Sequence, residues 1–213
     1  MRRVIWGLAV VVVTGFVGVP GGFAAPRVGG EVFGAYNTHA MNNVNDGIEA
    51  TNLSLGTSFE ELTGGITGGL SIRVWPTGSW MLSGTWEPIF LETKDSATDS
   101  RITANANAIQ VSAVYFLPSL VPAKYGFGAG VGYYLLNGES EFPPSPVVKT
   151  EGSGTGFHLM GMAELPVSPG FAVTGAAGWR WADIEIDNSS PTTTANYTGF
   201  MGRVGLAFYL PTP

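Results

Sequence analysis

Two histidines, His39 and His158, are the side chains of this sequence best suited to acid–base chemistry or metal binding. Histidine titrates near neutral pH and is the commonest metal ligand among side chains. The chain has no cysteine, however, and two histidines far apart in sequence do not resemble a transition-metal site. Glu92, Asp95 and Asp99 share one polar stretch that could bind a divalent cation weakly, but a solvated loop is the more ordinary interpretation. No cofactor and no metal are therefore predicted.

A glycine repeat is the second pattern that could carry chemistry. The stretch 124–138, KYGFGAGVGYYLLNG, has glycine at every second position from Gly126 to Gly132. A phosphate-binding G-x-G-x-x-G loop needs a sixth-position glycine, and the sixth position counted from Gly126 holds Val131. A flexible linker would be polar, whereas this stretch is rich in tyrosine. The period of two predicts a β-strand with one face free of side chains.

The first residues have the pattern of an export signal. Arg2 and Arg3 precede an apolar run from Val4 to Val19, and Gly22 and Ala24 have the spacing that signal peptidase reads. We expect a signal peptide at 1–24 and one mature domain at 25–213. The alternative is an uncleaved anchor, which is disfavoured because the run is short and no polar stop follows it.

Composition narrows the class of the exported chain. The net charge of −6 argues against nucleic-acid binding, which favours basic proteins. Charged residues make up only 12 % of the chain, about half the usual share, while aromatic residues also reach 12 %. Beyond the signal no apolar run approaches the length of a membrane helix. An exported, aromatic-rich chain of low charge is typical of a membrane β-barrel.

Alternation along the chain supports the same class. Eight segments show strand periodicity, at roughly 30–41, 66–75, 80–93, 105–117, 124–138, 156–165, 171–186 and 197–210. Longer polar stretches lie at 42–65, 94–104, 140–155 and 187–196, and they alternate with short turns. The predicted fold is therefore all-β: an eight-stranded antiparallel up-and-down transmembrane β-barrel. Its four long loops would be extracellular, its three short turns and both termini periplasmic, and a short helix is expected around 59–62.

The polar faces of these segments predict what fills the barrel. An eight-stranded barrel is just wide enough for side chains to fill it, and buried charges must be paired. The predicted inward faces carry three arginines and three glutamates, so their charges balance. The glycine row leaves space for these large side chains. Which arginine pairs with which glutamate depends on the shear of the barrel, which the sequence does not give. The predicted lumen network consists of Glu31, Arg73, Glu87, Gln110, His158, Glu164, Arg180 and Arg203, joined by Asn37 and His39.

Aromatic residues gather where the predicted strands meet the short turns. Trp and Tyr are enriched at membrane interfaces, where one end of the ring is apolar and the other wet. The sequence therefore predicts an interfacial girdle at the short-turn rim. Its members are Trp75, Trp80, Phe116, Tyr125, Phe171 and Tyr209.

The last predicted strand carries the most specific motif. Residues 203–210, RVGLAFYL, fit the pattern polar-x-Gly-x-x-apolar-x-apolar at Arg203, Gly205, Phe208 and Leu210. This resembles the assembly signal of the small eight-stranded outer-membrane barrels, the OmpA transmembrane domain, OmpX and OmpW-like proteins, and the resemblance covers about residues 28–210. It implies insertion by the barrel-assembly machinery into the outer membrane of a Gram-negative envelope, in contact with lipid and lipopolysaccharide. We expect no peptidoglycan-binding domain to follow the barrel, and we expect a monomer.

Barrels of this size include two kinds of lipid-modifying enzyme, and both need a histidine in a defined sequence context. A deacylase would have a serine two residues after the histidine, but Met160 follows His158 and Met41 follows His39. A palmitoyltransferase-like site needs a serine near His39, and none is close. No catalytic residue is therefore assigned and an enzyme is not expected.

Two main functions remain open. The first is a structural or surface-interaction barrel with a plugged lumen. The alternative is a porin-like channel of OmpW type that admits small apolar solutes through a lateral gap; Met160, Met162 and Met201, predicted inward, favour it. A soluble lipocalin-like barrel would need the opposite arrangement, a polar exterior and an apolar interior.

Overall fold

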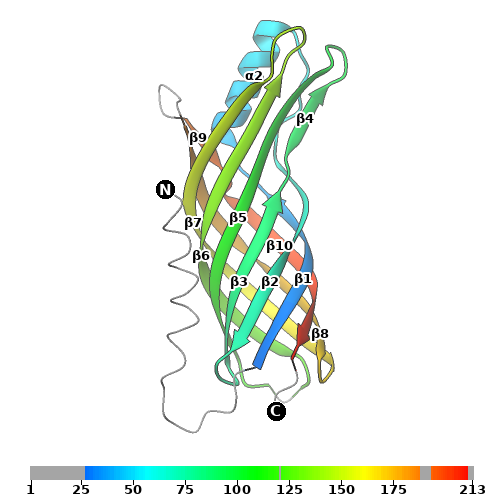
Figure 1. The fold of residues 1–213 in the computed structure, drawn as a ribbon, viewed down its shortest axis with the longest axis vertical. Helices are drawn as coiled ribbons and strands as arrows, with labels where there is room; N and C mark the ends of the chain where they lie inside the picture. Colours follow the sequence, from blue (N-terminus) through cyan, green and yellow to red (C-terminus); the bar gives the residue numbers. More distant parts are fainter. Residues whose placement is uncertain (1–26, 120, 188–192, 211–213) are drawn as a thin grey trace.

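The strands close into a barrel (Figure 1). The computed structural model describes residues 27–119, 121–187 and 193–210, so the predicted signal peptide lies outside the described residues. Each long strand pairs antiparallel with the next, and β10 pairs with both β8 and β1, which closes the sheet. The eight long strands of the described residues are β1 (Arg27–Thr38), β2 (Gly64–Trp75), β3 (Trp80–Ile89), β5 (Ser100–Phe116), β6 (Lys124–Glu141), β7 (Val148–Ser168), β8 (Phe171–Ile186) and β10 (Gly199–Tyr209). The predicted eight-stranded antiparallel barrel is confirmed.

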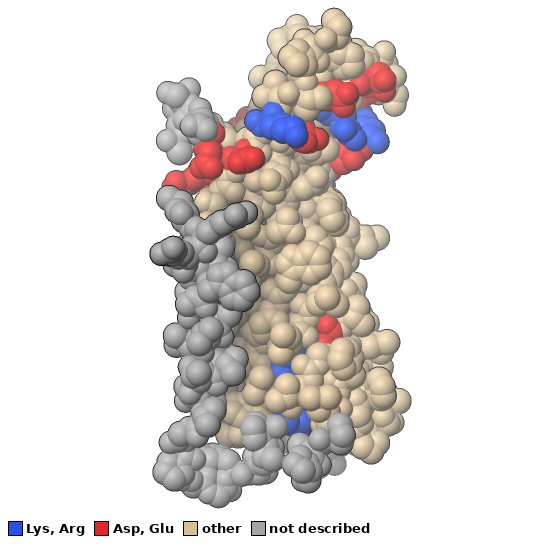
Figure 2. Space-filling view, in the orientation of Figure 1, with Lys and Arg blue, Asp and Glu red and all other residues tan. Residues whose placement is uncertain are grey.

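The period-two alternation decides which side chains face outward. Val131 and Val204 expose 64 % and 68 % of their surface, while Arg73 and Arg180 expose 0 % and 2 %. An apolar exterior around a polar interior is the reverse of a soluble barrel and is typical of barrels surrounded by lipid. Figure 2 shows that Lys, Arg, Asp and Glu gather near one end of the molecule and that the wall below them is largely uncharged.

The connections differ in length between the two ends. Short turns join the strands at one end, where Leu210 N–H also donates to the Val28 carbonyl, so the described chain begins and ends there. The opposite end carries the long connections, the helix α2 (Asn42–Leu55) and the short strands β4 (Glu92–Asp95) and β9 (Thr194–Asn196) (Figure 1).

The long connections differ from the prediction in two ways. The helix occupies 42–55 and not 59–62; Gly56, with φ 67°, ends it, and the returning segment, residues 57–63, forms no regular element. Strands β5 and β7 begin at Ser100 and Val148, inside stretches predicted to be loops. These strand ends are rich in polar residues and glycine, with only Ile102, Ala104 and Val148 as apolar members, so their alternation is weak.

None of the helices in the described part of the chain is long and apolar enough to cross a bilayer.

Candidate functional site: the barrel lumen

The glycine row of β6 forms a trough in the inner wall. A side chain at Gly130 would lie 2.6 Å from the imidazole of His158, and one at Gly132 would lie 3.1 Å from Gln110. The missing side chains therefore make room for the large groups of the neighbouring strands. His158 uses this space to reach Ser112, with 2.9 Å between Nε2 and Oγ.

A first ion cluster lies toward the short-turn end. Arg73 pairs with Glu31 and also with Glu164, the latter at 3.4 Å. The hydroxyl of Thr174 donates to Glu31, and the hydroxyl of Tyr209 donates to Glu164. One cation thus serves two buried carboxylates, and each carboxylate also accepts a hydrogen bond from one hydroxyl group.

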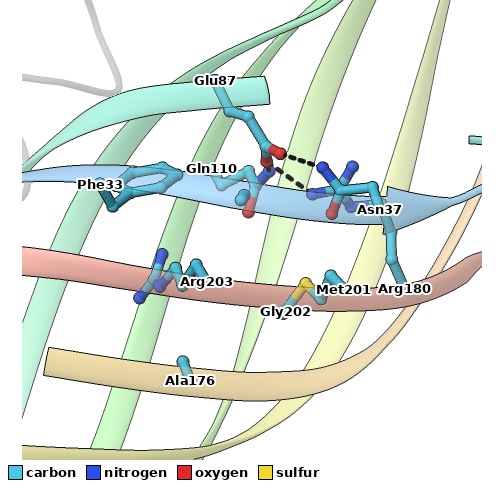
Figure 3. A pocket seen from close by; sticks show the side chains of 10 residues that line it. Phe33, Asn37, Glu87, Gln110, Ala176, Arg180, Met201, Gly202 and Arg203 are labelled. Atoms are coloured by element: carbon cyan, nitrogen blue, oxygen red, sulfur yellow. Dashed lines mark hydrogen bonds and ion pairs between the residues drawn. The ribbon is translucent and has the colours of Figure 1, made fainter. Parts of the chain in front are cut away.

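A second cluster surrounds Glu87 in the middle of the barrel (Figure 3). Its carboxylate accepts from Arg180 at 2.6 Å, from Asn37 at 2.7 Å and from Gln110 at 3.0 Å. These three donors come from β8, β1 and β5, so the carboxylate links strands across the lumen. Such a buried charge is tolerated because its lone pairs are taken by several donors.

Arg203 has a different environment from the other two arginines. Among the described residues no carboxylate lies within ion-pair distance of its guanidinium. Its contacts are instead the ring of Phe33, 5.1 Å from the guanidinium carbon, and the sulfur of Met160 at 4.0 Å. The balanced charge count of the sequence therefore does not give one carboxylate to each arginine.

Aromatic side chains close the lumen at the short-turn end. Trp75 and Phe116 pack with ring centroids 4.7 Å apart, in one buried cluster with Met81 and Tyr209. Two rim cations cover this cluster: the Arg27 guanidinium lies 3.6 Å from the Tyr209 ring, and Lys124 Nζ lies 4.5 Å from the Trp75 ring.

This closure corrects the predicted girdle. Three of its six members, Trp75, Phe116 and Tyr209, point inward and are buried. The other three, Trp80, Tyr125 and Phe171, are exposed on the outer wall at the same rim.

A second apolar cluster closes the lumen at the long-connection end. Ile48 of α2 and Phe59 and Leu62 of the returning segment pack onto side chains of the barrel wall. Tyr197 is buried among them, donates to the Ala104 carbonyl at 2.9 Å and contacts the ring of His39. His39 is therefore packed in this cluster and does not face solvent.

Asparagine side chains fix α2 to the segment that returns below it. Asn45 donates to the Leu62 carbonyl at 3.3 Å and accepts from its N–H at 2.9 Å. Asn52 makes the same reciprocal pair with Phe59, at 3.0 and 2.9 Å. Each side-chain amide thus bonds both the N–H and the C=O of one backbone residue, as a neighbouring strand would. We call residues 42–62, which these bonds hold together, the first-loop platform.

The acidic stretch after β3 is used for structure. Glu92 pairs with Lys94 at 2.6 Å, and Asp95 accepts from Thr98 at 2.6 Å and from Ser58 at 2.8 Å. The hydrogen bond from Thr98, followed by that from Ser58, lowers the pKa of Asp95 below its ordinary value. Among the described residues no group of three or more metal-binding side chains converges.

Among the long strands that the structure describes, the pairing of β2 with β3, the β2–β3 seam, is unusually short. Their ladder runs only from Leu70–Trp86 to Val74–Leu82, although β2 begins at Gly64. Beyond the ladder the strands remain adjacent, since the Thr67 hydroxyl donates to the Pro88 carbonyl. Proline has no N–H to donate to a ladder.

Comparison with known proteins adds the fold to this geometry. No family model and no curated protein matches the sequence. Among solved structures, a major outer membrane protein from Thermus thermophilus aligns with a TM-score of 0.57 at 11 % identity, covering 88 % of this chain and 100 % of that one. The chain has the fold of a small outer-membrane barrel. At such identity the likeness concerns the fold alone.

Two further outer-membrane-barrel structures agree. OprG from Pseudomonas aeruginosa aligns with a TM-score of 0.54 at 10 % identity over 92 % of this chain and 100 % of that one. Neisserial surface protein A aligns with a TM-score of 0.50 at 14 % identity over 90 % of this chain and 100 % of that one.

The last strand of this outer-membrane-barrel fold carries the residues of the predicted assembly signal. Phe208 and Leu210 lie on the outer wall, exposed by 49 % and 64 %. Gly205 faces inward, where an added Cβ would lie 2.9 Å from a Glu31 carboxylate oxygen. All eight residues of the predicted lumen network point into the barrel, although Arg203 lies outside both ion clusters.

Proposed function

We propose that this chain is an outer-membrane barrel with a closed lumen, whose role is exerted at its long-connection end and not by transport. The observation that carries the proposal is the double closure of the lumen. Trp75, Phe116 and Tyr209 fill one end, and Ile48, Phe59 and Leu62 cover the other. The two ion clusters lie between them, held by buried pairs from several strands.

The outer-membrane location is part of the same proposal. It is supported by the apolar outer wall and by the fold shared with outer-membrane proteins. Insertion by the barrel-assembly machinery would use Arg203, Gly205, Phe208 and Leu210, after removal of residues 1–24. The long connections would then face outward among lipopolysaccharide, as a monomer, with the first-loop platform as the preformed surface for a partner.

Electrical recording from purified protein in planar lipid bilayers tests the closed lumen. Wild-type protein is expected to give no steady pore, because side chains fill the lumen at both ends. The double variant Arg180→Ala/Arg203→Ala is expected to raise the leak, and Lys149→Ala, which removes one exposed charge, is the control. A steady conductance in wild-type protein would refute the plug.

Location is tested separately by fractionation. The protein is expected in the outer-membrane fraction, with a gel mobility that changes on heating. Recovery in the soluble fraction would contradict the location whatever the bilayer result.

The β2–β3 seam favours a second function, passage of small apolar solutes through the wall. Ile89 and Leu91, which follow the end of the ladder, belong to the apolar cluster at the long-connection end. Since the chain has no cysteine, Thr67→Cys/Ile89→Cys offers a clean lock across the seam, because both side chains face inward and continue the register of the ladder. If solutes pass there, oxidation should stop uptake of an apolar dye into proteoliposomes and reduction should restore it. Equal uptake in both states would exclude this route.

A further inference from the structure

A small cavity in the middle of the lumen brings two arginines together. Arg180 and Arg203 line it with Glu87, Asn37 and Gln110, and Phe33 contributes an apolar wall (Figure 3). The volume open to the centre of a water molecule is about 20 Å³. One water-sized species takes roughly 10–15 Å³ on this measure, so the cavity has room for one or two.

Hydrogen-bond donors outnumber acceptors in this cavity. Arg180 is 2 % exposed and uses one terminal nitrogen on Glu87, but its Nε and Nη1 have no partner among the described atoms. Arg203 Nε is also buried without a partner there. The acceptor left over among the lining residues is Asn37 Oδ1. A buried donor without an acceptor lowers the stability of the fold, so a hydrogen-bond acceptor in the cavity would be stabilising.

Charge in the cavity wall points in the same direction. Glu87 pairs with Arg180 and also accepts from Asn37 and Gln110, and no ion pair joins it to Arg203. Glu31 and Glu164 are both bound to Arg73, take one further hydrogen bond each from Thr174 and Tyr209, and do not line the cavity, although each keeps one buried oxygen without a partner among the described atoms. The cavity lining itself therefore carries two guanidinium groups and one carboxylate, although the lumen as a whole has three arginines and three glutamates.

We propose that this cavity binds one compact monovalent anion, such as a halide or a small carboxylate, through the guanidinium groups of Arg180 and Arg203. The excess of hydrogen-bond donors favours a ligand of negative charge, and the volume of the cavity limits its size. Phosphate or sulfate would exceed both the space and the charge. The site goes beyond the proposed function, because a closed barrel needs no ligand.

Thermal stability measures binding in the purified full chain. The heating midpoint of the gel-mobility change is compared in sodium chloride, sodium formate and sodium gluconate at equal sodium concentration. Gluconate is too large for the cavity. An anion that binds the folded barrel should raise the midpoint by roughly 2–4 °C over gluconate. Chloride acting alone identifies a halide site, whereas chloride and formate acting together identify a site for both classes.

Matched variants assign the effect to the cavity. Arg203→Gln is expected to lose the response to chloride. Arg101→Gln, which removes the same charge from the exposed pair with Glu141, is expected to keep it. Equal heating midpoints in all three salts for wild-type protein would overturn the proposal, and would mean that Glu31 balances the charge of Arg203 from a distance. An equal loss of the chloride response in Arg203→Gln and Arg101→Gln would also overturn it.

A second measurement does not depend on the variants. Crystals of wild-type protein grown in sodium bromide are expected to give an anomalous scattering peak in the lumen, beside Arg203 and Arg180. Ordered water at this position with no anomalous signal would also overturn the proposal.

Discussion

Glu87 is the residue on which the middle of the lumen depends. Its carboxylate is the shared acceptor for donors on three strands, Arg180, Asn37 and Gln110. Removing the charge leaves Arg180 buried without a counter-charge, and breaking a buried ion pair in this way costs far more than losing an exposed one.

Glu87→Gln is therefore expected to lower the free energy of unfolding by about 3–5 kcal/mol. Glu141→Gln, which breaks the exposed pair with Arg101, is expected to cost no more than about 1 kcal/mol. Urea unfolding in lipid vesicles measures both. A similar small cost for the two variants would show that the Glu87 cluster is not a tight network.

The glycine trough gives a second test at this scale. In Gly130→Ala the added methyl would lie 2.5 Å from the Val111 carbonyl oxygen and 2.6 Å from the His158 ring, so we expect a loss of about 1–3 kcal/mol in unfolding free energy. Gly34→Ala is the control, because nothing lies within 4 Å of a Cβ at that outward position. The control should be neutral or stabilising by up to about 1 kcal/mol. If both variants behave alike, the trough is not needed for packing.

Residue orientation was largely predictable because it follows parity along a strand. The same parity that turns Arg73 inward also turns Trp75 inward, so the burial of Trp75 was available from the sequence, as was that of Tyr209, which shares its parity with Arg203. The partners of each charge were not predictable. They depend on the stagger between strands, which brings Arg73 rather than Arg203 between Glu31 and Glu164.

At the scale of elements, α2 owes its place to tertiary contacts. Its sequence, NNVNDGIEATNLSL, is rich in asparagine, a weak helix former, so local propensity does not predict it. Two of these asparagines, Asn45 and Asn52, bond the returning segment, and the one buried side chain of the helix is Ile48. Such non-local bonds cannot be read from the sequence before the fold is known.

Asn45→Ala is expected to loosen the first-loop platform by roughly 1–3 kcal/mol, because two hydrogen bonds to Leu62 are lost. Hydrogen exchange at residues 57–62 should become faster, while exchange in β6 stays unchanged. Asn42→Ala, at an exposed position of the same helix, serves as the control and should change neither. Unchanged exchange in Asn45→Ala would mean that packing alone holds the platform.

The whole molecule has a strong polarity of charge. Apart from the buried glutamates, the carboxylates lie toward the long-connection end, whereas the short-turn rim has the cations Arg27 and Lys124 (Figure 2). At this scale the inverted amphipathicity of the sequence was enough to predict the fold. It could not predict the seam, because a ladder that stops early leaves the alternation of β2 and β3 intact.

Orientation in the membrane follows from the placement of the two ends. We expect Ser54→Cys, on the exposed part of α2, to react with a membrane-impermeant maleimide on intact cells. Gly78→Cys, in an exposed short turn, should react only after the cells are opened. The absence of native cysteine removes background labelling. The reverse pattern would place the long connections in the periplasm.

The early end of the β2–β3 ladder marks where the cylinder is mechanically weakest. Residues 64–69 are zipped to β1 on one side, but they have no ladder partner in β3 on the other. Amide groups directed toward that side lack ladder pairs with β3, so a pulling force should separate the wall there before it separates the first strand from the last.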